Sequence, residues 1–147
     1  MAATQGTSGF GTLIAYLNDA SPPTYTKVDE IYQVGGPGQS AEEIEMTHME
    51  SPGNRREFIQ SFIDGGELAF SINFLPTNAS HVQLTADQTA RTVRTWKVQW
   101  PDASDTTWSF DGFVKSFEPD APIDGRLSAA VVIRVTGDID FDDTAIE

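Results

Sequence analysis

The segment ELAFSINF, residues 67–74, has the clearest strand pattern in the chain. Large apolar residues occupy every second position, which places them on one side of an extended backbone. The apolar side consists of Leu68, Phe70, Ile72 and Phe74, and the opposite side of Glu67, Ala69, Ser71 and Asn73. We therefore predict a β-strand with one face in a hydrophobic core and one polar face.

Similar patterns occur on both sides of this segment. They predict strands over 12–17, 25–34, 42–49, 92–100, 106–117 and 126–136. Pro76 ends the 67–74 strand, and Asn78 is a suitable N-cap for a helix over roughly 79–90. His81 and Leu84, one turn apart, are expected to face the sheet.

These elements predict a mainly β protein with a single domain. We expect a β-sandwich or barrel with one flanking α-helix and a long inserted loop containing a short helix. The domain is predicted over 12–137, after a flexible arm at 1–11 and before an acidic tail at 138–147. The tryptophans are expected in the core or at a subunit boundary; they are Trp96, Trp100 and Trp108.

The inserted segment ESPGNRREFIQSFIDGGE, residues 50–67, has features of a short helix. Asn54 with Glu57 has the spacing of a helix N-cap, and Gly65 and Gly66 would stop the helix. Between them an apolar stripe at helical spacing is formed by Phe58, Ile59, Phe62 and Ile63. A helix of about nine residues is marginal in water by itself, so the stripe is expected to pack against something.

Charge and composition exclude several classes of protein. The net charge is −13, from 22 acidic and nine basic residues, which argues against a surface that grips nucleic acid. A surface along which DNA passes without sticking is compatible with this charge. The chain has no cysteine, which excludes disulfides and thiolate metal sites, and no apolar run approaches the roughly 20 residues of a membrane span.

Motifs for catalysis, metals or cofactors are not recognisable in the sequence. His48 and His81 do not form a metal-binding pair, and a lone histidine is more often structural. The segment DIDFDD, residues 138–143, has Asp143 where a calcium loop needs glycine. We therefore expect no catalytic residue, no metal and no cofactor, and look for function in assembly.

Several short motifs follow one another between residues 9 and 137. They are Gly36-Pro37-Gly38, Thr47, Ser51-Pro52-Gly53, Arg56-Glu57-Phe58, Asp64-Gly65-Gly66-Glu67, Arg94-Thr95-Trp96, Phe110, Gly112-Phe113-Val114 and Gly137. Their order and spacing resemble the major tail tube proteins of long-tailed, lambda-like bacteriophages, in particular the tube-forming domain. The chain departs from the lambda pattern because it lacks a C-terminal immunoglobulin-like domain.

This resemblance implies a structural role with no enzymatic activity. Hexameric rings would stack into a hollow tube in the virion tail, assembled in the cytoplasm of the bacterial host. The implied partners are other copies of the chain, other tail proteins at the tube ends, and DNA that passes through the lumen without specific binding. Ring formation needs heterologous contacts whose rotation closes, and open sheet edges could provide them.

Two groups of residues are candidate sites under this hypothesis. The inserted loop would dock on an adjacent subunit or ring through Ser51, Pro52, Arg55, Arg56, Phe58, Ile59, Phe62 and Ile63. The two arginines would meet acidic side chains of the partner. The 42–49 and 66–75 strands would form a continuous inner wall whose apolar faces cover the subunit core. The lumen would be lined by Glu43, Glu45, Thr47, Glu67, Ser71 and Asn73.

Other interpretations stay open at this point. The apolar stripe of the inserted segment could instead pack on its own subunit. The chain could be a β-sandwich binding module, either sugar-binding or capsid-decorating, which exposed tryptophans and a permanently monomeric state would favour. It could also be the tube protein of a phage-like secretion or injection system. A hydrolase with paired carboxylates has only generic acidic residues in its support.

Overall fold

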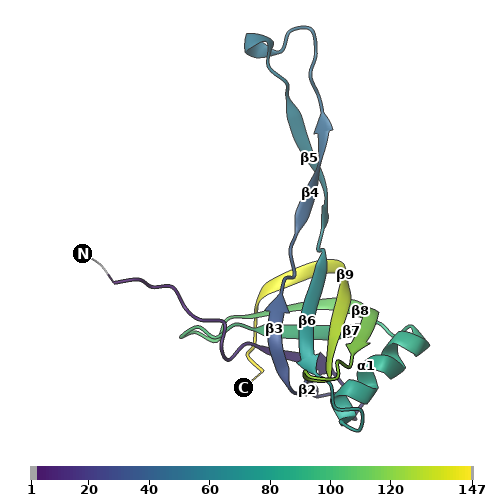
Figure 1. Cartoon of the computed structure of the whole chain (residues 1–147). Coiled ribbons are helices and arrows are strands. Elements are labelled where there is room, and N and C mark those ends of the chain that lie inside the picture. The colour runs from purple at the N-terminus through teal and green to yellow at the C-terminus, as the bar shows by residue number, and fades with distance from the viewer. Residues whose placement is uncertain (1–2, 147) are drawn as a thin grey trace.

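The computed structural model describes residues 3–146 and consists of a curved antiparallel sheet, one helix and a long protruding hairpin (Figure 1). The sheet has seven strands in the order β2-β1-β7-β8-β9-β6-β3. Their bounds are β1 Leu13–Leu17, β2 Tyr25–Lys27, β3 Ile31–Gly35, β6 Glu67–Asn73, β7 Arg94–Gln99, β8 Thr107–Asp120 and β9 Ser128–Asp143. The predicted mainly β fold with one flanking helix is confirmed.

The two edge strands of the sheet are neighbours in sequence. β2 and β3 are joined by residues 28–30 alone, so the single strand predicted over 25–34 is wrong. Three residues span at most about 10 Å, so the two edges lie close together. Val28 N donates to Ile14 O on β1, and Asn73 N on β6 donates to Glu30 O, each at 2.9 Å. The sheet therefore curls round until this connection bridges its edges.

The core lies inside the curled sheet and has the predicted alternation. Leu68, Phe70 and Ile72 of β6 are buried. Their antiparallel partners on β9 are also buried, with the pairs Leu68–Ile133, Phe70–Val131 and Ile72–Ala129. Fully burying a large apolar side chain contributes about 1.5–3 kcal/mol, so these pairs are a main source of stability. Trp96 of β7 is buried in the same core.

Helix α1, Ala79–Ala90, covers the flank of the sheet as predicted. Asn78 caps it, since its side-chain oxygen accepts a hydrogen bond from Ser80 N at 3.0 Å. His81 and Leu84 are fully buried, which confirms that they face the sheet. The ring of His81 accepts from Leu75 N at Nδ1, so Nε2 carries the proton and donates to Asp29 O at 2.8 Å. His81 is therefore a structural residue that ties α1 to the 28–30 connection.

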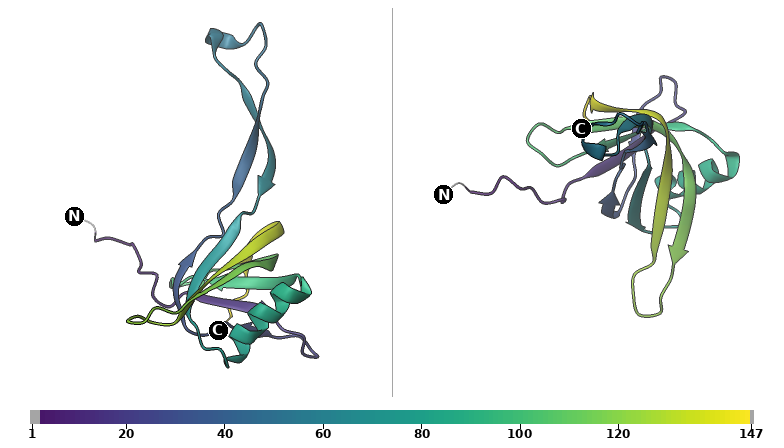
Figure 2. Two further views of the ribbon diagram at one scale, coloured as in Figure 1. Left: turned by 45° about the vertical axis from the view of Figure 1, so that its right-hand side comes forward. Right: turned by 90° about the horizontal axis from the view of Figure 1, so that it is seen from above.

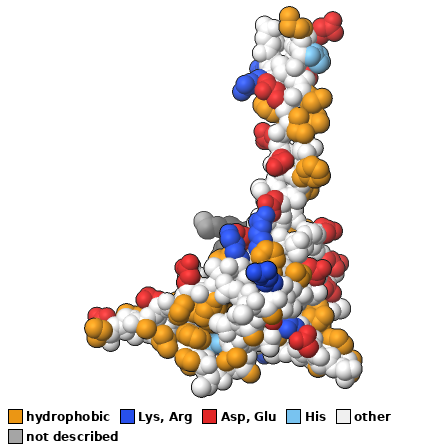
Figure 3. Space-filling view, turned by 90° about the vertical axis from the view of Figure 1, so that its right-hand side faces the viewer, with side chains coloured by type: hydrophobic (Ala, Val, Ile, Leu, Met, Phe, Trp, Pro, Cys, Tyr) orange, Lys and Arg blue, Asp and Glu red, His pale blue; other side chains and the backbone are white. Residues whose placement is uncertain are grey.

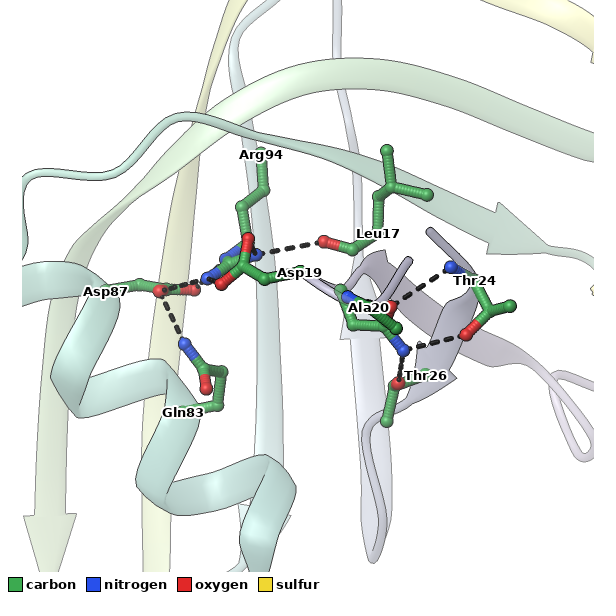
Figure 4. Close-up of polar contacts among 9 residues, drawn as sticks. Leu17, Asp19, Ala20, Thr24, Thr26, Gln83, Asp87 and Arg94 are labelled. Carbon is green, nitrogen blue, oxygen red and sulfur yellow. Dashed lines mark hydrogen bonds and ion pairs between the residues drawn. The ribbon is translucent and has the colours of Figure 1, made fainter. Parts of the chain in front are cut away.

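A buried arginine joins α1, β7 and the chain after β1 (Figure 4). Arg94 Nε and Nη2 donate to the two carboxylate oxygens of Asp87 at 2.6 and 3.0 Å. Arg94 Nη1 and Nη2 also donate to Asp19 at 3.0 and 2.9 Å, and Nη1 to Leu17 O at 3.0 Å. Arg94 and Asp87 are almost completely buried, whereas Asp19 is exposed. The guanidinium thus cross-links three separate segments.

The end of the chain continues the sheet. β9 was expected to stop near residue 136 but extends to Asp143. Lys97 Nζ donates to both Thr144 O and Thr144 Oγ1 at 3.0 Å, and lies 4.3 Å from the centre of the Tyr25 ring. Phe141 packs edge-on against Trp108, which packs against Trp100. Most of the segment predicted as an acidic tail is therefore strand.

The inserted segment contains no α-helix, and the prediction of a short α-helix after Asn54 is wrong. It forms the hairpin of β4, Ser40–Glu45, and β5, Phe58–Asp64, with only a 3-10 turn at Pro52–Asn54 near its tip. A β-bulge explains the misleading period. Ala41 pairs with Ile63 and Glu43 with Gln60, so two residues of β5 oppose Glu42 alone. The bulge interrupts the two-residue alternation of β5, so the apolar residues on either side of it have a spacing in the sequence that resembles that of a helix.

Within residues 3–146, no helix is long and apolar enough to span a membrane. In the same part of the chain, no group of three or more histidine, aspartate or glutamate side chains is arranged to hold a metal ion. The carboxylates that the sequence offers in quantity are distributed over the surface or paired with basic side chains.

Removing the negative charge of Asp87 is expected to destabilise the domain. Asp87→Asn leaves the buried Arg94 with one charged partner, and breaking a buried ion pair typically costs about 3 kcal/mol. Asp142→Asn, an exposed aspartate of β9, is the matched control and should change stability by less than about 0.5 kcal/mol. Urea unfolding of both variants checks this, and a loss below about 1 kcal/mol for Asp87→Asn would contradict it.

The exposed partner Asp19 should make the fold pH-dependent. Hydrogen bonds from Arg94, and its positive charge, hold the pKa of Asp19 below its ordinary value. Such a group stabilises the fold above its ordinary pKa, and the contribution is lost as the pH falls through the folded-state pKa. We expect wild type to be more stable than Asp19→Asn at pH 7, with the difference shrinking below about pH 4. Urea unfolding of both proteins at pH 7 and at about pH 3 measures the difference in stability. A difference that does not change with pH would contradict the prediction.

Candidate functional site

The β4–β5 hairpin stands away from the rest of the molecule (Figures 1 and 2). β4 and β5 form a separate two-stranded sheet and pair with each other. Ile44 lies opposite Ile59, and the next pair along, Glu45 and Phe58, points to the other face. Because Phe58 and Ile59 are adjacent in the strand, they place apolar side chains on both faces of the hairpin.

The hairpin exposes an unusual number of large apolar side chains. They are Ile44, Met46, Met49, Phe58, Ile59, Phe62 and Ile63. Phe62 is 82% exposed and Met49 fully exposed. Figure 3 shows hydrophobic side chains along the length of the hairpin. Isolated exposed apolar residues are normal, but a contiguous group on an open strand pair marks a surface for association.

The hairpin tip is held by its own hydrogen bonds. Ser51 Oγ donates to Glu57 Oε2 at 2.6 Å, and Glu57 N donates to Thr47 Oγ1 at 2.9 Å. Met46 N donates to Glu57 O at 2.7 Å, which continues the pairing beyond β4. Pro52 begins the 3-10 turn. The tip is therefore a defined loop in the single subunit.

The eight predicted interface residues all lie on this hairpin. Ser51 and Pro52 are at the tip, Arg55 and Arg56 follow the 3-10 turn, and the four apolar residues belong to β5. Arg56 Nε lies 3.2 Å from Glu45 Oε1, so it has an acidic partner within its own subunit. The structure thus brings the set together, in a strand pair where a helix was predicted.

The six predicted lumen residues fall into two separate groups. Glu43, Glu45 and Thr47 are on the hairpin, whereas Glu67, Ser71 and Asn73 are on β6 of the main sheet. Within one subunit these strands do not form one continuous sheet. Ile44 and Met46 are exposed on the hairpin and do not cover the core, so that expectation was wrong.

The polar face of β6 is already paired with basic side chains. Glu67 Oε1 accepts a hydrogen bond from Lys115 Nζ. Asn73 accepts a hydrogen bond from Arg126 Nη1 at 3.4 Å, and donates one to Glu30 at 3.2 Å. Figure 3 shows lysine and arginine side chains gathered where the hairpin meets the body. This face therefore carries both signs of charge.

Sequence reasoning missed the residues that hold the hairpin to the body. Arg134 of β9 pairs with Asp64 at 2.7 Å, at the end of β5. A cleft of about 710 Å³ lies beside them, lined by both the hairpin and β9. Arg134 occupies a position in an alternating strand like any other, so no local signal distinguishes it. The sequence suggested that Asp64 and the glycines after it merely stopped a helix.

A second apolar surface lies between the N-terminal arm and the edge strand β3. It is a groove of about 930 Å³. Its apolar lining residues are Phe10, Ile31, Tyr32, Val34, Trp100 and Pro101. Phe10 is 92% exposed although it lies beside the groove. This surface adds to the apolar area that a single subunit leaves open.

Comparison with solved structures finds the same fold in chains of phage tails and related assemblies. A chain in the tail of an empty GTA particle with C6 symmetry has a TM-score of 0.78 at 15% identity, covering 94% of this chain and 100% of that chain. A chain in the six-fold symmetrised baseplate of the anti-feeding prophage has a TM-score of 0.68 at 11% identity, covering 99% of both chains. A chain of the SPP1 tail tube has a TM-score of 0.64 at 11% identity, and the match covers 86% of this chain and 73% of that chain.

The sequence comparisons address the family directly. No curated protein matches this chain. A family model described as lambda phage tail tube protein matches residues 10–141, which is most of the chain. The match includes the main sheet, the helix and the protruding hairpin. This chain therefore belongs to the lambda phage tail tube protein family.

Proposed function

We propose that this tail tube protein assembles into hexameric rings that stack into a hollow tube, and that the hairpin makes the contact between copies. The proposal depends on the exposed apolar hairpin. The hairpin is ordered in the single subunit, and the rest of that subunit does not cover its apolar side chains. The six-fold symmetry named for two similar assemblies supports hexameric rings. The role is structural, in the virion tail.

The hairpin suits a contact between identical subunits. A ring and a stack both use heterologous contacts, in which a protrusion of one copy meets a different surface of the next. The hairpin supplies the protrusion, and its two strands have outer edges to which further strands could pair. Each large apolar side chain that becomes buried contributes about 1.5–3 kcal/mol. Several of them, repeated around a ring, offset the loss of freedom on association.

Acidic and neutral polar residues form the proposed lumen. The net charge of −13 gives the assembled tube a negative field, and DNA inside would be repelled from its wall. Glu43, Glu45 and Thr47 of the hairpin, with Glu67, Ser71 and Asn73 of β6, remain the candidates for this surface. The hairpin of one copy would have to meet β6 of another for the two groups to share one wall.

The proposed partners follow from the tube. Copies of the chain form its length, other tail proteins close its two ends, and the subunits are made and assembled in the cytoplasm of the bacterial host. We propose DNA as the cargo because the family is defined on a phage tail protein. Two similar structures come from an extracellular contractile injection system, and a tube of that kind is the second candidate.

Introducing a charge into the apolar hairpin should prevent assembly without unfolding the subunit. Phe62→Asp removes an aromatic side chain that is 82% exposed in the single subunit, so the core is unaffected. We expect a folded monomer by circular dichroism and no tubes by negative-stain electron microscopy. Val82→Asp, at an exposed apolar position of α1, is the control and should still assemble. Normal tubes from Phe62→Asp would refute the proposed contact.

Adding positive charge to the proposed wall should slow DNA transport and leave the tube intact. Glu45 and Glu67 already have basic partners, so the test uses Glu43→Lys together with Ser71→Lys. Lysines in the lumen would bind phosphates and hold the DNA back. Phage particles carrying both changes should have tails of normal length and eject DNA more slowly. The control is Thr89→Lys, an exposed position of helix α1 that lies outside the proposed wall. Ejection at the normal rate from the double variant would exclude these residues from the lumen.

A further inference from the structure

The hairpin joins the body through two short segments, which we call the hairpin foot: residues 36–39 and residues 65–66. On the body side, the β3–β6 ladder ends with the pair Gly35–Ala69. On the hairpin side, the β4–β5 ladder begins with the pair Ser40–Asp64. Between these pairs the structure describes no ladder pair joining the two segments. The foot is therefore a point at which the hairpin could pivot.

Glycines bring the two segments of the foot into close contact. Gly36 and Gly66 have φ values of +89° and +74°, which favour glycine. A Cβ at Gly66 would lie 2.1 Å from Gly38 O, and one at Gly36 would lie 2.4 Å from Glu67 O. This packing keeps the segments together, and the Val135 side chain of β9 lies against Gly65. A polar group that bonds directly to the hairpin would fix its angle more closely.

Arg134 supplies that group from β9. Its Nη2 donates to Asp64 Oδ2 at 2.7 Å and its Nη1 to Gly66 O at 3.2 Å. Asp64 Oδ1 in turn accepts from Gly66 N at 2.9 Å, and Val135 N donates to Gly66 O at 3.1 Å. One side chain on a central strand thus holds both the last residue of β5 and the foot beneath it.

The position of this contact matters more than its contribution to folding. Arg134 and Asp64 are both partly exposed, and such ion pairs add little to the stability of a domain. The hairpin, however, is a lever about 30 Å long, given a rise of about 3.3 Å per residue. A tilt of about 15° at the foot would move the tip by about 8 Å. Apolar contacts require approach within about 4.5 Å, so this tilt would misplace the interface.

We propose that Arg134, through Asp64 and Gly66, fixes the angle at which the hairpin leaves the body, so that the free subunit already presents the hairpin in its assembly orientation. A surface ordered before contact loses less conformational freedom when it binds. Arg134 is a positioning residue and belongs to neither the core nor the apolar contact. Its effect on assembly rests on the proposed function, whereas the fixed angle is a property of the monomer.

Spin labels can measure this angle in the isolated subunit. The chain has no cysteine, so Met49→Cys at the tip and Ala86→Cys on α1 would carry the only labels. Pulsed electron paramagnetic resonance on dilute, monomeric protein should give one narrow distance distribution. Adding Arg134→Gln should at least double its width, while circular dichroism shows that the domain stays folded. Arg134→Lys, which keeps the charge and loses the two-pronged contact, should fall between the two.

The matched control is Arg126→Gln, which removes an arginine that stacks on Tyr32 and contacts Asn73 away from the hairpin foot. It should leave the distribution narrow. If Arg134→Gln does not fold, Asp64→Asn replaces it and should broaden the distribution in the same way. A broad distribution in the parent protein, or an unchanged width in the foot variants, would overturn the proposal.

Assembly is measured separately on the unlabelled proteins. Arg134→Gln should raise the concentration at which tubes form several-fold, and Arg126→Gln should not. A broadened distribution together with an unchanged tube-forming concentration would overturn the link between the angle and assembly. If the parent forms no tubes at any concentration, the proposed function fails, and the distance measurement still decides whether Arg134 fixes the hairpin.

Discussion

The apolar side chains of the β4–β5 hairpin cannot be covered by the domain that carries them, and the rest of the molecule is arranged around this constraint. β5 has apolar side chains on both faces, so packing one face on the body would still leave the other in water. The foot directs the hairpin away from the body (Figure 1). Under the proposed function, these side chains are buried between molecules.

The body is complete without the hairpin. Its sheet curls until the 28–30 connection bonds to both β1 and β6, and His81 holds that connection to α1. Arg94 ties α1 and β7 to the chain after β1 through two carboxylates. None of these contacts involves the hairpin, so the contacts that hold the body together and the proposed contacts between subunits use different residues. This separation lets a tube protein remain folded before it finds its partners.

Much of the body could be predicted from its sequence, because burial on one face imposes alternation on β6, and the cap at Asn78 marks the start of α1. The hairpin could not. The bulge of β5 opposite Glu42 interrupts the strand alternation, so the apolar residues Phe58, Ile59, Phe62 and Ile63 have a helix-like spacing in the sequence. The segment is a strand because it pairs with β4, which a local pattern does not reveal. The predicted interface residues were nevertheless found together, since exposure of apolar groups does not depend on the element that carries them. The contact of Arg134 with Asp64 joins residues far apart in sequence and left no local signal.

Hydrogen–deuterium exchange of residues 40–64, measured in the monomer and again in the assembled state, tests most directly whether other copies cover the hairpin. The account predicts that amides of β4 and β5 exchange rapidly in the monomer and become strongly protected on assembly, whereas the core strands β6 and β9 are protected in both states. Equal exchange of the hairpin amides before and after assembly would contradict it.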